Sequence, residues 1–330
     1  MLPSSAVRIP FQIPARGPVV DVVGMGENSF DLLAVVAEYP ANGTKQRLQR
    51  FAWQPGGQIA TALVACAKLG WKPRYIGRFG SDEFGTRSRE SLIAAGVDVS
   101  RARIVASATN QFAVVLVDAR TGERTVLWDR HPGLNVELDD VVEEAVNSGR
   151  VLMVDCQEPA VAVKAARLAR REGIPTLAGV EKVRPGIQNL LCHVDAIIAD
   201  ADFPTALTGY EELGRALEAM AREFNAPLVC VPLGADGSLA RCSGWEIRTP
   251  GYSVDCVDST GAGDVFRGAF AAGCLRAPCG DVEDVLAYAN AAAALSCRAL
   301  GARGALPHAD DVERLIFSRP RMQPLGSAPV

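Results

Sequence analysis

The sequence predicts an α/β fold, with a doubly wound, mainly parallel sheet, helices on both faces, and a small β-sheet that lies over it as a lid. From Val151 onward, short apolar segments alternate with helical ones, which is typical of a parallel sheet covered by helices. Two β-rich segments, at about 31–50 and 107–131, interrupt this pattern. Neither can bury a face alone, so we expect them to combine into the lid.

The first half of the chain predicts one end of the main sheet and most of the lid. Val19–Gly24 is a short apolar run that ends in glycine, as expected for a buried strand before a turn. The elements expected next are a strand pair over 31–50 with its turn at 40–43, an alanine-rich helix over 57–69, a strand over 74–79, a helix over 82–95 capped by Asp82, and a hairpin joining 112–118 to 124–128.

The second half predicts the rest of the main sheet. The expected strands are 151–154, 176–178, 196–199 and 228–231, and the expected helices include 161–171 and 213–224. A single large domain over 18–330 accounts for this pattern, because α/β domains commonly exceed 200 residues. Residues 1–17 contain several prolines, do not form the apolar core of a signal peptide, and are expected to be a flexible tail.

Composition excludes several classes of partner. The formal net charge is −4, so there is no basic field to hold a nucleic acid, and no run approaches the ~20 apolar residues of a membrane helix. The nine cysteines include no Cys-x-x-Cys pair, which indicates a reducing compartment and favours the cytoplasm. The three histidines have no metal-ligand spacing.

The segment Val257–Asp264 carries the strongest chemical signal. Gly261, Ala262 and Gly263 stand at the start of an apolar helix, where free backbone N–H groups and the helix dipole form a site for a phosphate or developing anion. Asp264 follows directly, as expected for a base that deprotonates a hydroxyl attacking a phosphoryl group. The alternative is a capped helix start whose glycines serve only close packing.

A second motif runs from Gln54 to Leu63. Its paired glycines, Gly56 and Gly57, allow backbone to approach a ligand, and the polar side chains of Gln58 and Thr61 follow on the first turns of a helix. Packing does not require a glutamine there. The alternative is an ordinary turn that begins a helix.

These two motifs, in this order and at this spacing, resemble the two signatures of the ribokinase/PfkB carbohydrate kinase family, and the resemblance covers the chain from about Val19 to its end. Finer features, such as Trp53–Gly57 and Gly179–Lys182, resemble its ketohexokinase-like and sulfofructose kinase-like branches. The resemblance implies a ribokinase-like fold, ATP as phosphoryl donor, Mg²⁺, a monovalent cation such as K⁺, and phosphorylation of a hydroxyl on a small sugar.

The resemblance also implies residue roles. Asp264 matches the catalytic base, and the backbone of Gly261, Ala262 and Gly263 matches the anion hole. Substrate-binding positions are matched by Asp31, Gly57, Gln58 and Thr61, nucleotide-binding positions by Gly234, Gly237 and Asn290, and the monovalent-cation loop by Asp258, Thr260 and Gly301.

The chain departs from the family pattern at the magnesium motif. The usual Asn-x-x-Glu appears as Asp200–Phe203, so Asp200 or Asp202 is expected to hold magnesium-bound water instead. Further acidic candidates are Asp155, Glu158 and Glu181, and the alternative for each is a capping or strand-end acid.

The second departure concerns the acceptor. Thr61 stands where many members have asparagine, so one amide that would bind sugar hydroxyls is missing. Arg267, and Arg130 from the lid, are candidate substrate-binding cations, and arginine suits carboxylate, phosphate or sulfonate. A keto-sugar or anionic sugar is therefore expected rather than ribose. The alternative is that both arginines face solvent and Thr61 only packs.

Two other functions also fit the sequence. One is a nucleoside kinase of the same fold, and the other is a catalytically weak sensor that binds a sugar or nucleotide. The lid is also expected to pair with the lid of a second chain in a homodimer, because an exposed sheet needs cover. The sequence does not name the acceptor.

Overall fold

The computed structural model describes residues 6–15, 19–120 and 124–318. Its main sheet has the strand order β14-β13-β12-β11-β10-β9-β1-β4. Neighbouring strands are parallel from β4 to β12, and β13 and β14 are added antiparallel. The strands are β1 Val22–Met25, β4 Pro73–Ile76, β9 Val151–Val154, β10 Thr176–Val180, β11 Ala196–Ala199, β12 Leu228–Pro232, β13 Ser238–Cys242 and β14 Trp245–Thr249.

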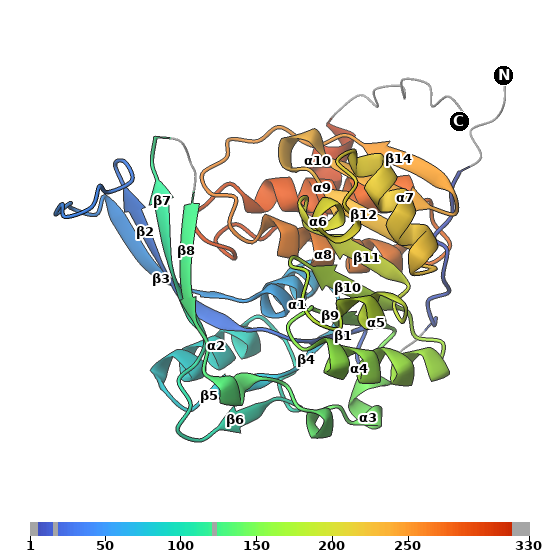
Figure 1. Ribbon diagram of the computed structural model, residues 1–330, viewed down its shortest axis with the longest axis horizontal. Helices are drawn as coiled ribbons and strands as arrows, with labels where there is room; N and C mark the ends of the chain where they lie inside the picture. The colour runs from blue at the N-terminus through green and yellow to red at the C-terminus, as the bar shows by residue number, and fades with distance from the viewer. Residues whose placement is uncertain (1–5, 16–18, 121–123, 319–330) are drawn as a thin grey trace.

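Helices cover both faces of this sheet, as the sequence predicts (Figure 1). One face packs against α1 Gln58–Lys68, α8 Ala262–Arg276, α9 Val282–Ser296 and α10 Ala309–Phe317. The other packs against α3 Glu143–Val146, α4 Pro159–Arg171, α5 Ile187–Leu191, α6 Phe203–Thr208 and α7 Leu213–Glu223. The doubly wound α/β prediction is therefore confirmed.

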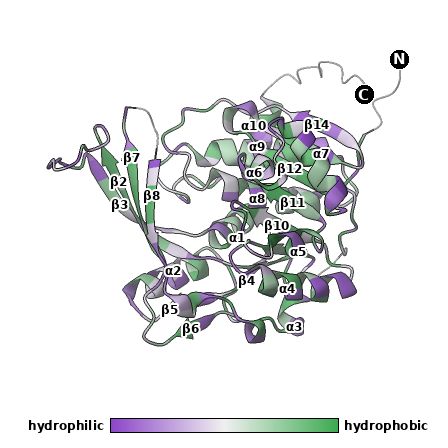
Figure 2. Ribbon diagram, viewed as in Figure 1, coloured by the Kyte–Doolittle hydropathy of each residue, from purple (hydrophilic) through white to green (hydrophobic). Residues whose placement is uncertain are grey.

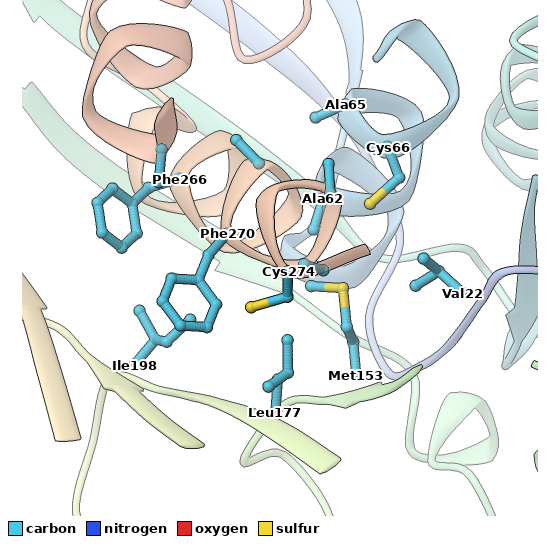
Figure 3. Packing of buried hydrophobic residues seen from close by; sticks show 14 of the residues in the cluster. Val22, Ala62, Ala65, Cys66, Met153, Leu177, Ile198, Phe266, Phe270 and Cys274 are labelled. Carbon is cyan, nitrogen blue, oxygen red and sulfur yellow. The ribbon is translucent and has the colours of Figure 1, made fainter. Parts of the chain in front are cut away.

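The core below α8 fixes the position of that helix. Phe266, Phe270 and Cys274 point from α8 towards Leu177 of β10 and Ile198 of β11 (Figure 3). Alanines of α1 lie beside the same helix, and a Cβ at Gly268 would meet the backbone carbonyl of Ala62. Only glycine permits α8 to approach α1 this closely. The packing of the two helices therefore fixes the orientation of α8.

The lid is a separate four-stranded sheet in the order β3-β2-β7-β8, and it projects from one side of the body (Figure 1). Its strands are β2 Ser29–Val36, β3 Arg50–Gly56, β7 Phe112–Asp118 and β8 Arg124–Asp129. A short sheet, β5 Arg78–Gly80 with β6 Arg103–Val105, and the helix α2 Glu83–Ala94 connect the lid to the body. The two segments thus combine into one sheet, as expected.

One strand of the lid begins later than predicted. The expected strand pair over 31–50 is wrong in its second member, because β3 covers Arg50–Gly56 and residues 37–49 form a connection. Sequence alternation does not separate this polar connection from an exposed strand. The predicted strand over 74–79 is divided into β4 and β5 at Gly77.

The predicted flexible tail over 1–17 is wrong for its described part. Ile9 and Ile13 are buried, the Ile9 N–H donates to Gly280 O over 3.1 Å, and Arg150 donates to Pro14 O over 2.7 Å. Burying each isoleucine side chain stabilises the folded state by about 1.5–3 kcal/mol. The neighbouring prolines do not prevent this burial. Residues 1–5 and 16–17 lie outside the described residues.

Hydropathy follows the layers of the fold: apolar colouring concentrates on the strands and the helices around them, and polar colouring on outer helix surfaces (Figure 2). All nine cysteines are free thiols.

Candidate active site

The start of α8 forms the centre of the candidate site. Gly261 is its N-terminal cap, with φ 75°, a left-handed conformation that glycine adopts without steric cost. The Ala262 N–H donates to Ser259 O over 3.2 Å, so the expectation that all three motif N–H groups are free is wrong for Ala262. An added Cβ at Gly263 would meet nothing within 4 Å, so this turn faces open space.

Asp264 lies on the first turn of α8, beside the carboxyl ends of β10 and β11. Its carboxylate accepts a hydrogen bond from Arg267 over 2.8 Å. Burial raises the pKa of Asp264 to about 7; Arg267 opposes this shift, and the nearby carboxylates of Asp200 and Glu181 add to it. A carboxylate with a pKa near neutrality can accept a proton from an alcohol more readily than an ordinary aspartate.

Arg267 is fixed under this carboxylate. Its guanidinium also donates to Asp200 over 2.6 Å and to Gln58 over 3.4 Å. The side chain crosses Gly179 of β10, where an added Cβ would lie 2.9 Å from it. Both ionic partners of Arg267 therefore belong to the protein, and the contacts give no support to its expected role as a free cation for the acceptor.

Arg130 is similarly engaged. It follows β8 and donates to Gln111 over 2.7 Å, to Leu134 O over 2.8 Å and to Glu158 over 3.3 Å, and Glu27 lies 3.8 Å away. Its hydrogen bonds and both nearby glutamates belong to the protein. The structure therefore offers no free Arg130 guanidinium to an anionic acceptor.

The residues of the second motif gather around Asp31 and the start of α1. Asp31 accepts from Ser29 Oγ over 2.9 Å and from the Ala113 N–H over 3.0 Å, and burial raises its pKa to about 6. Gly57 has φ 88° and caps α1, and Gln58 reaches Arg267. Thr61 is fully buried. The motif thus joins Asp31 to the Asp264 cluster.

Arg303 is a residue of this site that the sequence reasoning missed. Its guanidinium donates to Thr61 Oγ1 over 3.2 Å, to Ser91 Oγ over 3.1 Å and to Gly56 O over 2.7 Å. Asp31 and Asp264 are both close enough to act on its charge. We refer to Asp31, Gln58, Thr61, Asp264 and Arg303 together as the acceptor site, because the sequence predicts that the first four contact the acceptor. The one sequence feature that could have indicated Arg303 is its position two residues after Gly301, in the predicted cation loop.

The lid contacts the body at the edge of this site. Arg124 of β8 donates to Ser259 Oγ over 3.0 Å, and Gln54 of β3 donates to Leu300 O over 3.0 Å. Leu33, Val35 and their neighbours on the inner face pack against Leu300. The lid therefore lies over the loops that precede α8 and follow α9.

Comparison with known proteins shows which family has this sequence pattern. The family described as pfkB family carbohydrate kinase matches residues 20–309. The chain belongs to the PfkB carbohydrate kinase family. An ATP-dependent ribose-1-phosphate kinase from Halopiger xanaduensis is 30% identical over 304 residues, which cover 91% of this chain and 99% of that protein. The Bacillus subtilis ribokinase is 25% identical, over 88% of this chain and 98% of its own length.

Solved structures share the fold. Arabidopsis thaliana ribokinase, in a structure complexed with ribose and ATP, has a TM-score of 0.78 at 24% identity, covering 90% of this chain and 99% of that one. The protein is an ATP-dependent carbohydrate kinase. None of the helices in the described part of this PfkB kinase is long and apolar enough to cross a membrane.

The three residues that the sequence predicts to bind the nucleotide lie next to residues that line a cavity of about 400 Å³. It is lined by Leu233, Asp236, Ser238, Arg248, Thr249 and Pro250. Gly234 and Gly237 form the adjoining turn, with φ 59° and 93°. Asn290 is buried and its amide donates to Ser238, Thr249 and Pro250 at 3.1–3.3 Å, so it supports the cavity wall.

The predicted cation loop is organised by Asp258. One carboxylate oxygen accepts from the Thr260 N–H over 2.9 Å and the Thr260 hydroxyl over 2.7 Å, and the other accepts from the Gly301 N–H over 2.7 Å. These contacts connect the loop before α8 to the loop after α9. The loop position therefore depends on the Asp258 carboxylate.

The acidic residues suggested for magnesium do not form one cluster. Asp200 lies beside Asp264 with one oxygen bound by Arg267, whereas Asp202 is the exposed residue before α6 and its side chain makes no capping hydrogen bond. Phe203 is buried in the core, so no acid replaces the family's glutamate there. Among the described residues, no group of three or more acidic, cysteine or histidine side chains is placed to hold a metal. The half-exposed Asp200 fits an ion held mainly by phosphates and water.

Asp155, Glu158 and Glu27 form a separate buried acidic group. The Glu27 N–H donates to Asp155 over 2.7 Å. Burial raises the pKa of Glu27 to about 8 and that of Glu158 to about 7, with Asp155 adding to both shifts. Arg130 contacts both glutamates, so this group supports the base of the lid.

Proposed function

We propose that this kinase transfers the γ-phosphoryl group of ATP to a hydroxyl of a small sugar, with Asp264 as the general base. The observation that supports this is the raised pKa of Asp264, to about 7, on a helix turn whose Gly263 faces open space. The hydroxyl would lie between Asp264 and the phosphoryl group. Asp264 accepts the hydroxyl proton as the new O–P bond forms and the bond to ADP breaks.

The backbone at the start of α8 supplies the anion hole in this proposal. The N–H of Gly263 is directed to the phosphoryl oxygens, together with the positive end of the helix dipole. Arg267 holds Asp264 in position and balances its negative charge. Mg²⁺, when bound beside Asp200, neutralises phosphate charge. The lid excludes water, which would otherwise accept the phosphoryl group.

The test is a coupled assay of ADP release with a panel of ketohexoses, ketopentoses, sugar acids, phosphosugars, sulfosugars and nucleosides. A relative phosphorylates ribose 1-phosphate and others are ribokinases and fructokinases, so the panel includes ribose and fructose. We expect a keto-sugar or anionic sugar to be the best acceptor. Turnover confined to nucleosides would contradict the proposal.

We also propose that K⁺ binds near Asp258, Thr260 and Gly301 and increases the rate. The Asp258 carboxylate already ties these segments together, and a cation in their loop would hold the N–H groups of the anion hole towards the phosphate. Replacing K⁺ with tetramethylammonium at constant ionic strength, with Mg²⁺ present, is expected to lower kcat several-fold. An unchanged kcat would remove the monovalent cation from the mechanism.

A homodimer through the outer face of the lid is a further part of the proposal. Trp53, Leu32, Val114 and Leu127 form one cross-strand row on that face, and Leu127 is 58% exposed. Such an apolar sheet face is normally covered. Light scattering is expected to give twice the mass of one chain.

Leu127→Asp is expected to convert this dimer to monomers, because it places a charge in the apolar row. Phe317→Asp is the control, since Phe317 is 80% exposed and lies on α10, which is not part of the lid. A wild-type protein that is monomeric at all concentrations would contradict the dimer. We place the kinase in the cytoplasm, which its nine free thiols support.

A further inference from the structure

Arg303 occupies the acceptor site without an ionic partner. Its three hydrogen bonds go to neutral oxygens: the hydroxyls of Thr61 and Ser91 and the carbonyl of Gly56. A guanidinium has five N–H donors, so two remain without a partner among the described residues. The three contacts come from α1, α2 and β3, and therefore fix the plane of the guanidinium.

The two other arginines near the site, unlike Arg303, have carboxylate partners. Arg267 forms ion pairs with Asp200 and Asp264, and Arg130 with Glu158 and Glu27. No carboxylate in the described part of the chain lies within ion-pair distance of Arg303. Burial lowers the pKa of Arg303 to about 10, so its cation is partly removed from water and remains charged at neutral pH.

The hydrogen bonds of Arg303 place its charge beside Asp31. Arg303 donates to Gly56 O over 2.7 Å, and a Cβ added at Gly56 would lie 2.2 Å from the Asp31 carboxylate, which itself forms no ion pair with Arg303. The charges of Asp31 and Asp264 also act to raise the pKa of Arg303. A partly buried, preorganised cation with spare donors is costly unless a ligand supplies the opposite charge. Its planar fork is suited to the oxygens of a phosphate, carboxylate or sulfonate.

We propose that Arg303 binds an anionic group of the acceptor sugar, at a position away from the hydroxyl that is phosphorylated. The inference rests on the proposed sugar kinase function and deepens it by assigning the substrate class: sugar phosphates, sugar acids or sulfosugars. Thr61 is then a positioning residue, because its hydroxyl orients the guanidinium. This replaces Arg267 and Arg130 as the basis for an anionic acceptor.

The experiment compares matched neutral and anionic sugars on the full chain: ribose with ribose 1-phosphate, glucose with gluconate, and fructose with 6-deoxy-6-sulfofructose. The wild type is expected to prefer the anionic member of at least one pair. Arg303→Gln is expected to lower kcat/KM for that member about 30-fold or more while changing the neutral member only slightly. Which pair responds identifies the phosphate, carboxylate or sulfonate.

Arg241→Gln is the matched control, because Arg241 forms an ion pair with Glu218 on the protein surface. It is expected to leave every kcat/KM unchanged. If Arg303→Gln does not fold, Arg303→Lys decides the question: it keeps the charge without the fork, so the anionic preference falls but is not abolished. Equal losses for both members of each pair, or an unchanged preference in the folded variant, would overturn the proposal.

Calorimetric binding separates this inference from the proposed function. If no sugar is phosphorylated, the proposed function fails, and binding of the three anionic sugars to the wild type and to Arg303→Gln still tests Arg303. Binding that is lost in the variant supports the anion site. Equal binding to both proteins, or no binding to the wild type, refutes it.

Discussion

Replacing Asp264 with asparagine is expected to reduce kcat by about 10²–10⁴-fold or more while ATP binding and the folded structure persist. Asparagine keeps the shape of the side chain and can still contact Arg267, but it cannot accept the substrate proton. The α8 helix is anchored by Phe266 and Phe270 in the core, so its start should not move. Steady-state kinetics with the best acceptor, and calorimetric titration with ATP, measure the two effects.

Asp310→Asn provides the comparison, since Asp310 is an exposed acid on the first turn of α10. It loses the same charge on a similar helix turn without touching the acceptor site, and it should retain wild-type kcat. An Asp264→Asn enzyme with nearly full kcat would show that another group accepts the proton.

Replacing Phe270 with alanine is expected to lower the free energy of unfolding by about 3–5 kcal/mol. Phe270 is 1% exposed and lies between α8 and the strands that carry Leu177 and Ile198 (Figure 3). The variant loses the favourable free energy of burying the phenyl group, and the cavity that the truncation leaves adds a further cost. Urea unfolding of the wild type and the variant measures the difference.

Phe317→Ala tests the specificity of this effect. Phe317 is 80% exposed near the end of α10, so the same truncation there should change the free energy of unfolding by no more than about 0.5 kcal/mol. Similar losses for the two variants would mean that α8 packing does not dominate the core.

Much of the fold was predictable because apolar periodicity is a local signal. The expected strand 151–154 coincides with β9, and the expected helix 57–69 differs from α1 by one residue at each end. Asp82 caps α2 as predicted, and its side chain accepts from the Gly85 N–H. The N-terminal segment was missed because the burial of Ile9 depends on distant residues around Gly280.

The site was predictable only where function follows a contiguous motif. Asp264 and the Gly261–Gly263 turn lie in one segment, so their chemistry could be inferred from neighbouring residues. Arg303 belongs to the site through its hydrogen bond to Thr61, which is 242 positions away in the sequence. The same limit applies to Arg267: its charge suggested an anionic acceptor, and only the fold shows its ion pairs with Asp200 and Asp264.

The pH dependence of kcat/KM tests the role of Asp264 most directly. A base must be deprotonated to act, and burial raises the Asp264 pKa to about 7, so the rate is expected to fall tenfold per pH unit below that value. Ionisation of ATP and acceptor affects the wild type and Asp264→Asn alike, so the ratio of their kcat/KM values isolates the carboxylate. The account predicts a ratio that is constant above about pH 8 and falls steadily towards about pH 5. A ratio that stays constant over this whole range would contradict it.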